Sequence, residues 1–170
     1  MLSAAIFVIF PFCMVYAAVS DMVTMTIANR VSILLVVTFA ALAPLTGMDW
    51  QTYGMHFAAG GLVLAVTFGL FAIGAMGGGD AKLLAATSVW MGLGLPLAQY
   101  VVWSGMVGGL LTIGILAFRY SPFAIYASNN LFLRHLADSK AGIPYGIALG
   151  IAGLLAFPNS ALALWVLGTR

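Results

Sequence analysis

The chain has 170 residues, 64% of them apolar, and only ten are charged: six Lys or Arg and four Asp, with no Glu. About a quarter of the residues of an ordinary soluble domain are charged, so this composition excludes a disordered chain and argues strongly against a soluble domain. The net charge of +2 comes from basic residues scattered over loops, which disfavours nucleic-acid binding and leaves lipid as the main solvent of the chain.

Six apolar stretches of the chain are interpreted as membrane-spanning helices. They cover residues 2–20, 31–46, 53–76, 83–95, 97–118 and 143–157. A helical span needs about 20 mostly apolar residues to cross roughly 30 Å of hydrocarbon, so the short fourth stretch is compatible with a tilted or partly re-entrant helix. Residues 160–168 are too few to span alone and are expected to extend the sixth helix past Pro158. The sequence therefore predicts an all-α polytopic membrane protein with about six transmembrane helices, forming one integral-membrane domain over residues 1–170.

The loops between the predicted helices differ in charge. With six spans, the first, third and fifth loops share one side, and they contain five basic residues: Arg30, Lys82, Arg119, Arg134 and Lys140. The opposite side contains only Arg170. Because cytoplasmic loops are enriched in Lys and Arg, these three loops are predicted to be cytoplasmic, with both termini outside. Residues 121–139, in the long fifth loop, are interpreted as a linker on the membrane surface.

Glycines at helical spacing predict where helices pack closely. Gly142, Gly146 and Gly150 recur every fourth residue along the sixth predicted helix, as do Gly105 and Gly109 along the fifth. Small residues at this spacing let two helix backbones approach each other in a membrane. Both stripes are therefore interpreted as helix contacts rather than as functional sites.

The four aspartates divide into two pairs. Asp49 lies in a predicted outer loop and Asp138 in a polar stretch, and each is most simply a solvated charge. Asp21 directly follows the first predicted helix and Asp80 the third, so the alternation of helix directions places both carboxylates at the same depth on the cytoplasmic side. A carboxylate at a costly position in the membrane indicates function. Asp80 could also serve only as the N-cap of the fourth helix.

Three consecutive glycines precede Asp80. Residues 77–79 leave the backbone free to adopt unusual conformations close to another chain, as a site that accepts an extended peptide requires. A phosphate-binding loop is disfavoured, because no Lys-Ser or Lys-Thr pair follows the glycines and no strand precedes them. Two neighbouring carboxyls can hydrolyse a peptide bond with water and without metal or cofactor, one as general base and one as general acid. The sequence does not assign the two roles, since a coupled pair titrates as a unit.

Three segments together resemble a known family. Residues 21–30 read Asp-Met-Val-Thr-Met-Thr-Ile-Ala-Asn-Arg, and residues 77–82 read Gly-Gly-Gly-Asp-Ala-Lys. They resemble the two aspartate motifs of the type IV prepilin peptidases, which are membrane aspartyl proteases of the GxGD class. Residues 140–146, Lys-Ala-Gly-Ile-Pro-Tyr-Gly, resemble a third signature of that family. The short length is similar to that of the small branch that serves tight-adherence pili.

The resemblance implies cleavage of the short basic leader of a type IV pilin precursor at the cytoplasmic face of the bacterial inner membrane, after a glycine that borders the hydrophobic helix. The implied partners are the pilin precursor and membrane lipid, and no metal or cofactor is implied. Asp21 and Asp80 would be the catalytic pair, and Gly77 and Gly79 would shape the approach of the substrate. The implied supporting residues are Asn29, Lys82, Pro144 and Tyr145.

The residues by themselves leave other functions open. A small proton- or cation-coupled transporter would use intramembrane carboxylates, but both acids lie at one face and no charged residue lies in the middle of a span. A structural subunit would be favoured if Asp80 were only a helix cap. A protease similar to presenilin or signal peptide peptidase would cut inside a membrane helix, whereas aspartates at the boundary favour a cut at the membrane surface. His56 and His135 fit no metal-ligand spacing and are expected to be interfacial polar residues.

Overall fold

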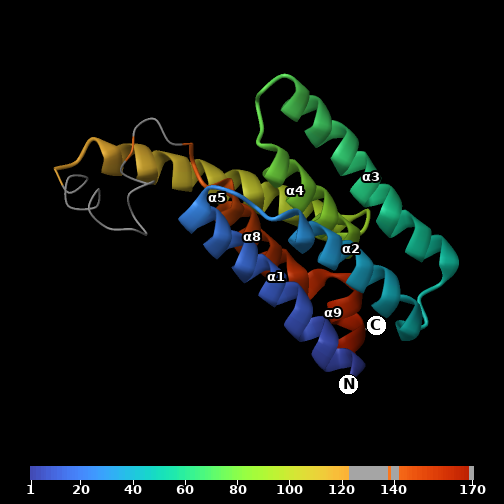
Figure 1. The fold of residues 1–170 in the computed structure, drawn as a ribbon. Helices are drawn as coiled ribbons and strands as arrows, with labels where there is room; N and C mark the ends of the chain where they lie inside the picture. Colours follow the sequence, from blue (N-terminus) through green and yellow to red (C-terminus); the bar gives the residue numbers. More distant parts are fainter. Residues whose placement is uncertain (123–137, 139–141, 169–170) are drawn as a thin grey trace.

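The computed structural model describes residues 1–122, 138 and 142–168 (Figure 1). Within them, seven α-helices follow in chain order: α1 (Leu2–Thr24), α2 (Asn29–Leu42), α3 (Trp50–Ala72), α4 (Gly78–Met91), α5 (Leu95–Arg119), α8 (Tyr145–Ala156) and α9 (Ala161–Leu167). Two 3-10 helices, η1 (Pro44–Thr46) and η2 (Phe157–Asn159), follow α2 and α8. Most of the expected surface linker lies outside the described residues, together with Arg134, His135, Lys140 and Arg170.

Each of the six predicted spans corresponds to a helix, and the prediction of an all-α polytopic membrane protein is confirmed. Four segments of the described chain are long and apolar enough to cross a membrane: α1, α2 with η1, α3 and α5. A fifth span exists if α8 with η2 and α9 are counted together, although they are bent by 49° at Ser160. The expected extension past Pro158 is therefore a separate helix, and the Ser160 side chain caps it by accepting a hydrogen bond from the N–H of Ala163.

The predicted fourth span is the exception, because α4 is a helix of the protein core. Its 14 residues extend only about 21 Å at 1.5 Å per residue, which is less than the roughly 30 Å of a bilayer core. All residues from Leu83 to Met91 are buried, and α4 contacts α2, α3, α5, α8 and α9. A helix that is apolar on all sides must be covered on all sides. Neighbouring helices provide most of that cover here, in place of lipid.

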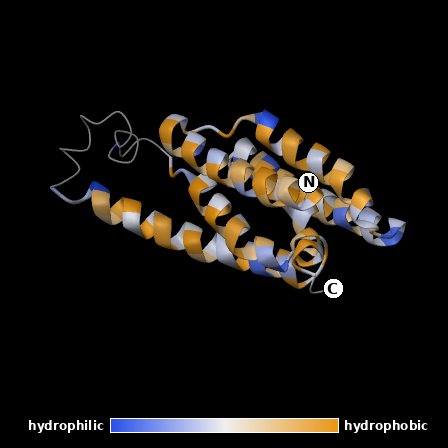
Figure 2. Ribbon diagram, turned by 90° about the horizontal axis from the view of Figure 1, so that it is seen from below, coloured by the Kyte–Doolittle hydropathy of each residue, from blue (hydrophilic) through white to orange (hydrophobic). Residues whose placement is uncertain are grey.

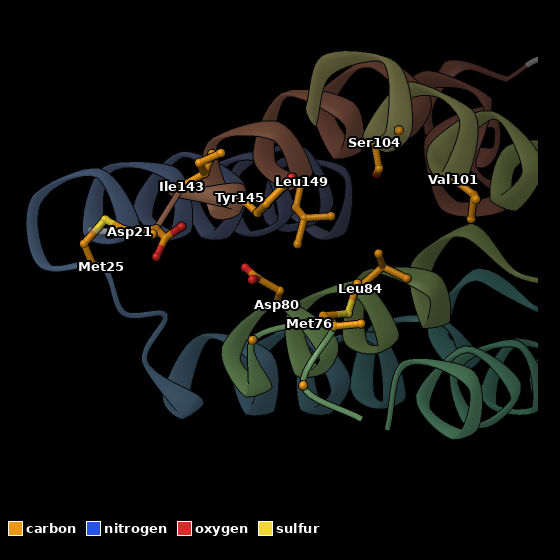
Figure 3. A pocket seen from close by; sticks show the side chains of 15 residues that line it. Asp21, Met25, Met76, Asp80, Leu84, Val101, Ser104, Ile143, Tyr145 and Leu149 are labelled. Carbon is orange, nitrogen blue, oxygen red and sulfur yellow. The ribbon is translucent and has the colours of Figure 1, made fainter. Parts of the chain in front are cut away.

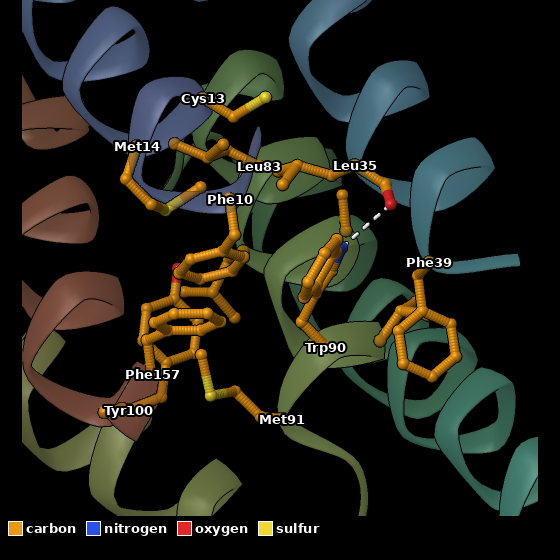
Figure 4. Packing of buried hydrophobic residues seen from close by; sticks show 14 of the residues in the cluster. Phe10, Cys13, Met14, Leu35, Phe39, Leu83, Trp90, Met91, Tyr100 and Phe157 are labelled. Carbon is orange, nitrogen blue, oxygen red and sulfur yellow. Dashed lines mark hydrogen bonds between the residues drawn. The ribbon is translucent and has the colours of Figure 1, made fainter. Parts of the chain in front are cut away.

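A cluster of aromatic side chains fixes α4 against its neighbours (Figure 4). The Trp90 indole Nε1–H of α4 donates a hydrogen bond to the backbone carbonyl oxygen of Leu35 in α2, at 2.8 Å. The Trp90 ring also packs against Phe10 of α1, which in turn stacks on Phe157 of η2 with ring centroids 4.5 Å apart. This cluster ties α1, α2, α4 and η2 together, and it thereby holds the orientation of α4, whose first turn carries Asp80.

Large apolar side chains remain exposed on the outer faces of the long helices, among them Val8 of α1, Phe68 of α3 and Leu110 of α5. Figure 2 shows that hydrophobic residues recur along the full length of these helices. In water such a surface would be an unusually large apolar patch. In a bilayer it is the surface that faces lipid, and the chain is therefore a membrane protein.

Candidate active site

Asp21 lies in the last turn of α1, not directly after a helix as predicted, because α1 continues to Thr24. Its side chain is only 6% exposed. The helix ends where Met25 adopts a left-handed backbone conformation with φ of 54°. The Asp21 Oδ2 accepts a hydrogen bond of 2.7 Å from the backbone N–H of Gly146, in the first turn of α8. A negative charge is disfavoured at the C-terminal end of its own helix, and the N-terminus of α8 offsets that cost.

Asp80 is the third residue of α4 and does not cap this helix. The N-cap position is occupied by Gly77, and no side chain caps the helix start. The alternative that Asp80 serves only as the N-cap is therefore wrong. An acidic residue in the first turn is nevertheless favoured by the helix dipole. The connection from α3 to α4 spans residues 73–77 and turns at Gly74, whose φ is 75°.

The carboxyl groups of Asp21 and Asp80 face each other across a cavity of about 740 Å³ (Figure 3). Beyond the carboxyls, the cavity continues between mainly apolar side chains, among them Met76, Leu84, Val101 and Leu149. Both aspartates also line a second cavity of about 270 Å³, together with Thr26, Asn29 and residues 77–79. The pair thus lies between a larger, mainly apolar cavity and a smaller one formed by the connections that precede α2 and α4.

The electrostatics of Asp80 reflect both burial and the neighbouring acid. Asp80 lies in α4, outside the helices that are long enough to span a membrane. Burial and, to a smaller extent, the charge of Asp21 raise the pKa of Asp80 to about 7. Two carboxyls that interact in this way do not both ionise easily, so the pair can hold one proton at neutral pH. Such a pair combines a proton acceptor with a proton donor.

The glycines before Asp80 occupy positions where a side chain would meet a neighbour. An ideal Cβ on Gly77 would lie 2.9 Å from the Asp80 Oδ2, and one on Gly79 would lie 3.3 Å from the Cβ of Ile27. Gly79 therefore allows the start of α4 to pack against the connection between α1 and α2. The expected role of both glycines in the approach of a substrate stays a prediction.

The predicted supporting residues lie at the same end of the bundle. The Lys82 Nζ donates a hydrogen bond of 3.0 Å to the Asn29 Oδ1, which joins the N-terminal parts of α4 and α2. Pro144 is fully buried at the N-cap position of α8. Tyr145 lines the larger cavity, and its hydroxyl lies 3.0 Å from the Thr112 Oγ1 of α5. The three sequence motifs thus meet in space, although they come from α1, α2, α4 and α8.

Gly146 is the residue that the sequence interpretation assigned to packing and that the structure brings into the site. An ideal Cβ on Gly146 would lie 2.7 Å from the Asp21 Cβ and 2.9 Å from its Oδ2. Gly150, one turn later, makes the expected close contact with α1, since its Cβ would lie 2.8 Å from the Met14 carbonyl oxygen. Gly142 precedes α8 and does not belong to the stripe. The sequence signal that points to Gly146 is its place in the third motif.

The other predicted glycine stripe does not make the expected helix contact. A Cβ on Gly105 or Gly109 would meet no atom within 4 Å. The close contact of α5 with α8 is made by Gly108, whose Cβ would lie 3.2 Å from the ring of Tyr145. The four-residue spacing indicates that Gly105 and Gly109 share one side of α5. The close contact with α8, however, is made at Gly108.

His56 is buried rather than interfacial, contrary to the sequence-based expectation. It is 4% exposed, and its Nδ1 lies 2.7 Å from the backbone carbonyl oxygen of Val89. The last carbonyls of a helix lack partners within the helix, so His56 supplies one at the C-terminal end of α4. Asp49 agrees with expectation as an exposed charge, and it caps α3 by accepting a hydrogen bond from the N–H of Thr52.

Comparison with known proteins assigns the chain to one family. A family model described as the type IV leader peptidase family matches residues 8–113, which is more than half of the chain. The matched range contains both aspartates of the site together with Asn29, Gly77 and Lys82. No curated protein and no solved structure gives a significant match.

Proposed function

The chain belongs to the type IV leader peptidase family, and from that premise we propose that it is a membrane aspartyl endopeptidase that removes the leader of type IV pilin precursors. Asp21 and Asp80 are the catalytic pair in this proposal, and no metal or cofactor takes part. The observation that carries the proposal is the pair of carboxyls, Asp21 buried and Asp80 partly buried, that face each other across one cavity. The assignment to the tight-adherence branch stays a prediction from the short length of the chain.

The proposed reaction places one water molecule between the two carboxyls. The ionised carboxyl takes a proton from this water, and the oxygen of the water attacks the carbonyl carbon of the scissile bond. The protonated carboxyl gives its proton to the carbonyl oxygen. The raised pKa of Asp80, about 7, supports a pair that holds one proton near neutral pH.

The two cavities that meet at the aspartates suggest how the precursor lies. A pilin precursor has a basic leader followed by a hydrophobic helix, so its two parts need different surroundings. In our proposal the leader occupies the smaller cavity beside Asn29, and the start of the hydrophobic helix occupies the larger cavity beside Val101 and Leu149. The bond to be cut then lies between the carboxyls, at the boundary between the two parts.

The proposed orientation places this end of the bundle in the cytoplasm. Among the described residues, the Lys and Arg side chains are Arg30 at the start of α2, Lys82 at the start of α4 and Arg119 at the end of α5. These helix ends lie on the same side of the bundle as Asp21 and Asp80, and basic residues favour the cytoplasmic side. In bacteria this corresponds to the inner membrane.

The direct test is cleavage of pilin precursors by the purified protein in proteoliposomes, followed by mass spectrometry of the pilin N-terminus. We expect loss of the leader and a new N-terminus at the border of the hydrophobic helix. The control is a precursor in which the glycine before the cut is replaced by Trp, and it should remain intact. If a panel of type IV and tight-adherence precursors stays uncut by folded protein, the peptidase proposal is wrong and ion or proton flux becomes the next measurement.

The rate of cleavage is expected to fall as the pH rises above about 7. One carboxyl of the pair must carry a proton, and the raised pKa of Asp80 means that this proton is lost in that range. Each further pH unit should then lower the rate about tenfold. Values of kcat/KM, obtained from initial rates over roughly pH 5 to 9, measure this decrease on the alkaline side. A rate that stays constant to the alkaline end would contradict the need for a protonated carboxyl.

A further inference from the structure

We propose that Gly146 is a positioning residue whose backbone N–H keeps Asp21 as the ionised member of the pair, so that Asp21 is the general base and Asp80 the general acid. This role rests on the proposed function and deepens it, because the motifs alone leave the two carboxyls equivalent. The evidence is an asymmetry in how the structure holds them.

Asp21 has a hydrogen-bond donor that stabilises its negative charge. Its Oδ2 accepts the 2.7 Å hydrogen bond from Gly146, in a buried environment. Gly146 is the second residue of the twelve-residue helix α8, so its N–H has no partner within the helix and lies at the positive end of the helix dipole. Pro144 occupies the N-cap position and is fully buried, which fixes where α8 begins.

The position must be glycine for this contact to exist. A Cβ at Gly146 would lie 2.7 Å from the Asp21 Cβ, 2.9 Å from its Oδ2 and 3.0 Å from its Cγ. The side chain of Asp21 thus fills the space that any other residue at position 146 would need. Helix packing alone would require only a small residue against the α1 backbone, as Gly150 shows. At Gly146 the close neighbours are the atoms of the proposed base itself.

Asp80 lacks a comparable partner in the described part of the chain. The described residues donate no hydrogen bond to its carboxyl, and Lys82 is bonded to Asn29 instead. Both carboxyls are desolvated, and the one without a hydrogen-bond donor is the one that keeps the shared proton more easily. The charge is therefore expected on Asp21 and the proton on Asp80.

The reaction balances with these roles. Asp21 takes a proton from water as the C–O bond forms, and Asp80 gives its proton to the carbonyl oxygen, which yields a tetrahedral diol. When the C–N bond breaks, the leaving nitrogen takes the proton from Asp21 and a diol hydroxyl returns one to Asp80. The pair thus regains its starting protonation without any other group.

The kinetic test compares Gly146→Ala with Gly150→Ala. We expect Gly146→Ala to lower kcat by about 100-fold, the scale of moving a reacting group by about 1 Å, with KM changed less than about threefold. Gly150→Ala introduces a similar steric conflict with α1, at the Met14 carbonyl oxygen, but does not touch Asp21. It should retain kcat per folded molecule within about threefold. Equal losses of kcat in the two variants, or full activity of Gly146→Ala, would overturn the proposal.

A second test does not depend on a substrate. The chain contains only four Asp and no Glu, so ¹³C labelling of the Asp side-chain carboxyls gives four NMR signals, which the four single Asp→Asn variants assign. At neutral pH we expect the wild-type Asp21 signal at the carboxylate position and the Asp80 signal at the protonated position. In Gly146→Ala the Asp21 signal should shift, while those of Asp49 and Asp138 stay in place.

A wild-type Asp21 signal at the protonated position would overturn the role of Gly146. So would an Asp21 signal that does not respond to Gly146→Ala. Either result can be reached even if no precursor is cleaved, so failure of this proposal is distinguishable from failure of the peptidase function.

Discussion

Replacing Asp21 or Asp80 by Asn is expected to lower kcat for precursor cleavage by about 10⁴-fold, the upper end of the range for a positioned acid or base. The amide of Asn has nearly the shape of a carboxyl, but it neither takes a proton from water nor gives one to the carbonyl oxygen in the required way. Because both carboxyls act on the same water, the double variant should be no slower than the slower single variant. Initial rates at equal amounts of folded protein measure these effects.

Asp49→Asn is the matched control for these variants. Asp49 lies at the opposite end of α3 from the site, is exposed, and accepts a hydrogen bond from the N–H of Thr52 that Asn can also accept. This variant should retain the wild-type rate within about twofold. Wild-type activity in Asp21→Asn or Asp80→Asn would exclude the two-carboxyl mechanism. Loss of activity in all three variants would indicate instead that the substitutions impair folding or insertion.

Gly77→Ala is expected to lower kcat by about 100-fold while changing the stability of the protein little. The added Cβ would lie 2.9 Å from the Asp80 Oδ2, which is closer than nonbonded atoms normally approach. The Asp80 carboxyl can rotate away at low cost, so the fold tolerates the change. The rotation, however, displaces the reacting group. The backbone of Gly77, with φ of −70° and ψ of 142°, is equally accessible to alanine, so no backbone strain contributes.

Gly78→Ala tests whether this effect is specific. A Cβ on Gly78 would lie 3.3 Å from the ring of Phe71, a side chain that is 48% exposed and free to move outward. We expect kcat within about threefold of wild type, because this contact does not involve either carboxyl. Thermal unfolding in detergent should be similar for both variants. Equal losses of activity in Gly77→Ala and Gly78→Ala would mean that the glycine run acts through flexibility rather than through the space beside Asp80.

The placement of Asp21 and Asp80 at the same end of the bundle is a prediction that needed little more than counting helices. Apolar stretches indicate where helices run, and alternating directions bring the end of the first and the start of the fourth to one side of the membrane. The length of α1 was less predictable, since Asp21 belongs to its last turn. A charged residue ends a hydropathy pattern, whereas a helix ends where its backbone hydrogen bonds end, here at Met25.

For helix α4, hydropathy alone does not predict whether the apolar residues are buried in lipid or in protein. Transfer from water into an apolar environment is favourable whether that environment is lipid or protein, so the apolar residues after Asp80 predict burial but not its kind. The structure encloses them among other helices, and the buried His56 supplies a polar contact at the far end of α4 that no spacing of residues indicates.

Residue types and their order along the chain were enough to predict an all-α membrane protein, the approximate place of each helix and the presence of two acids at one end of the bundle. These properties depend on residue type and on separation along one chain. The tertiary structure was needed to show that Gly146 meets Asp21, that a Cβ on Gly105 or Gly109 would meet no neighbour within 4 Å, and that the two carboxyls share a cavity. These properties depend on how each helix is rotated about its own axis, which is set by packing between segments far apart in the chain.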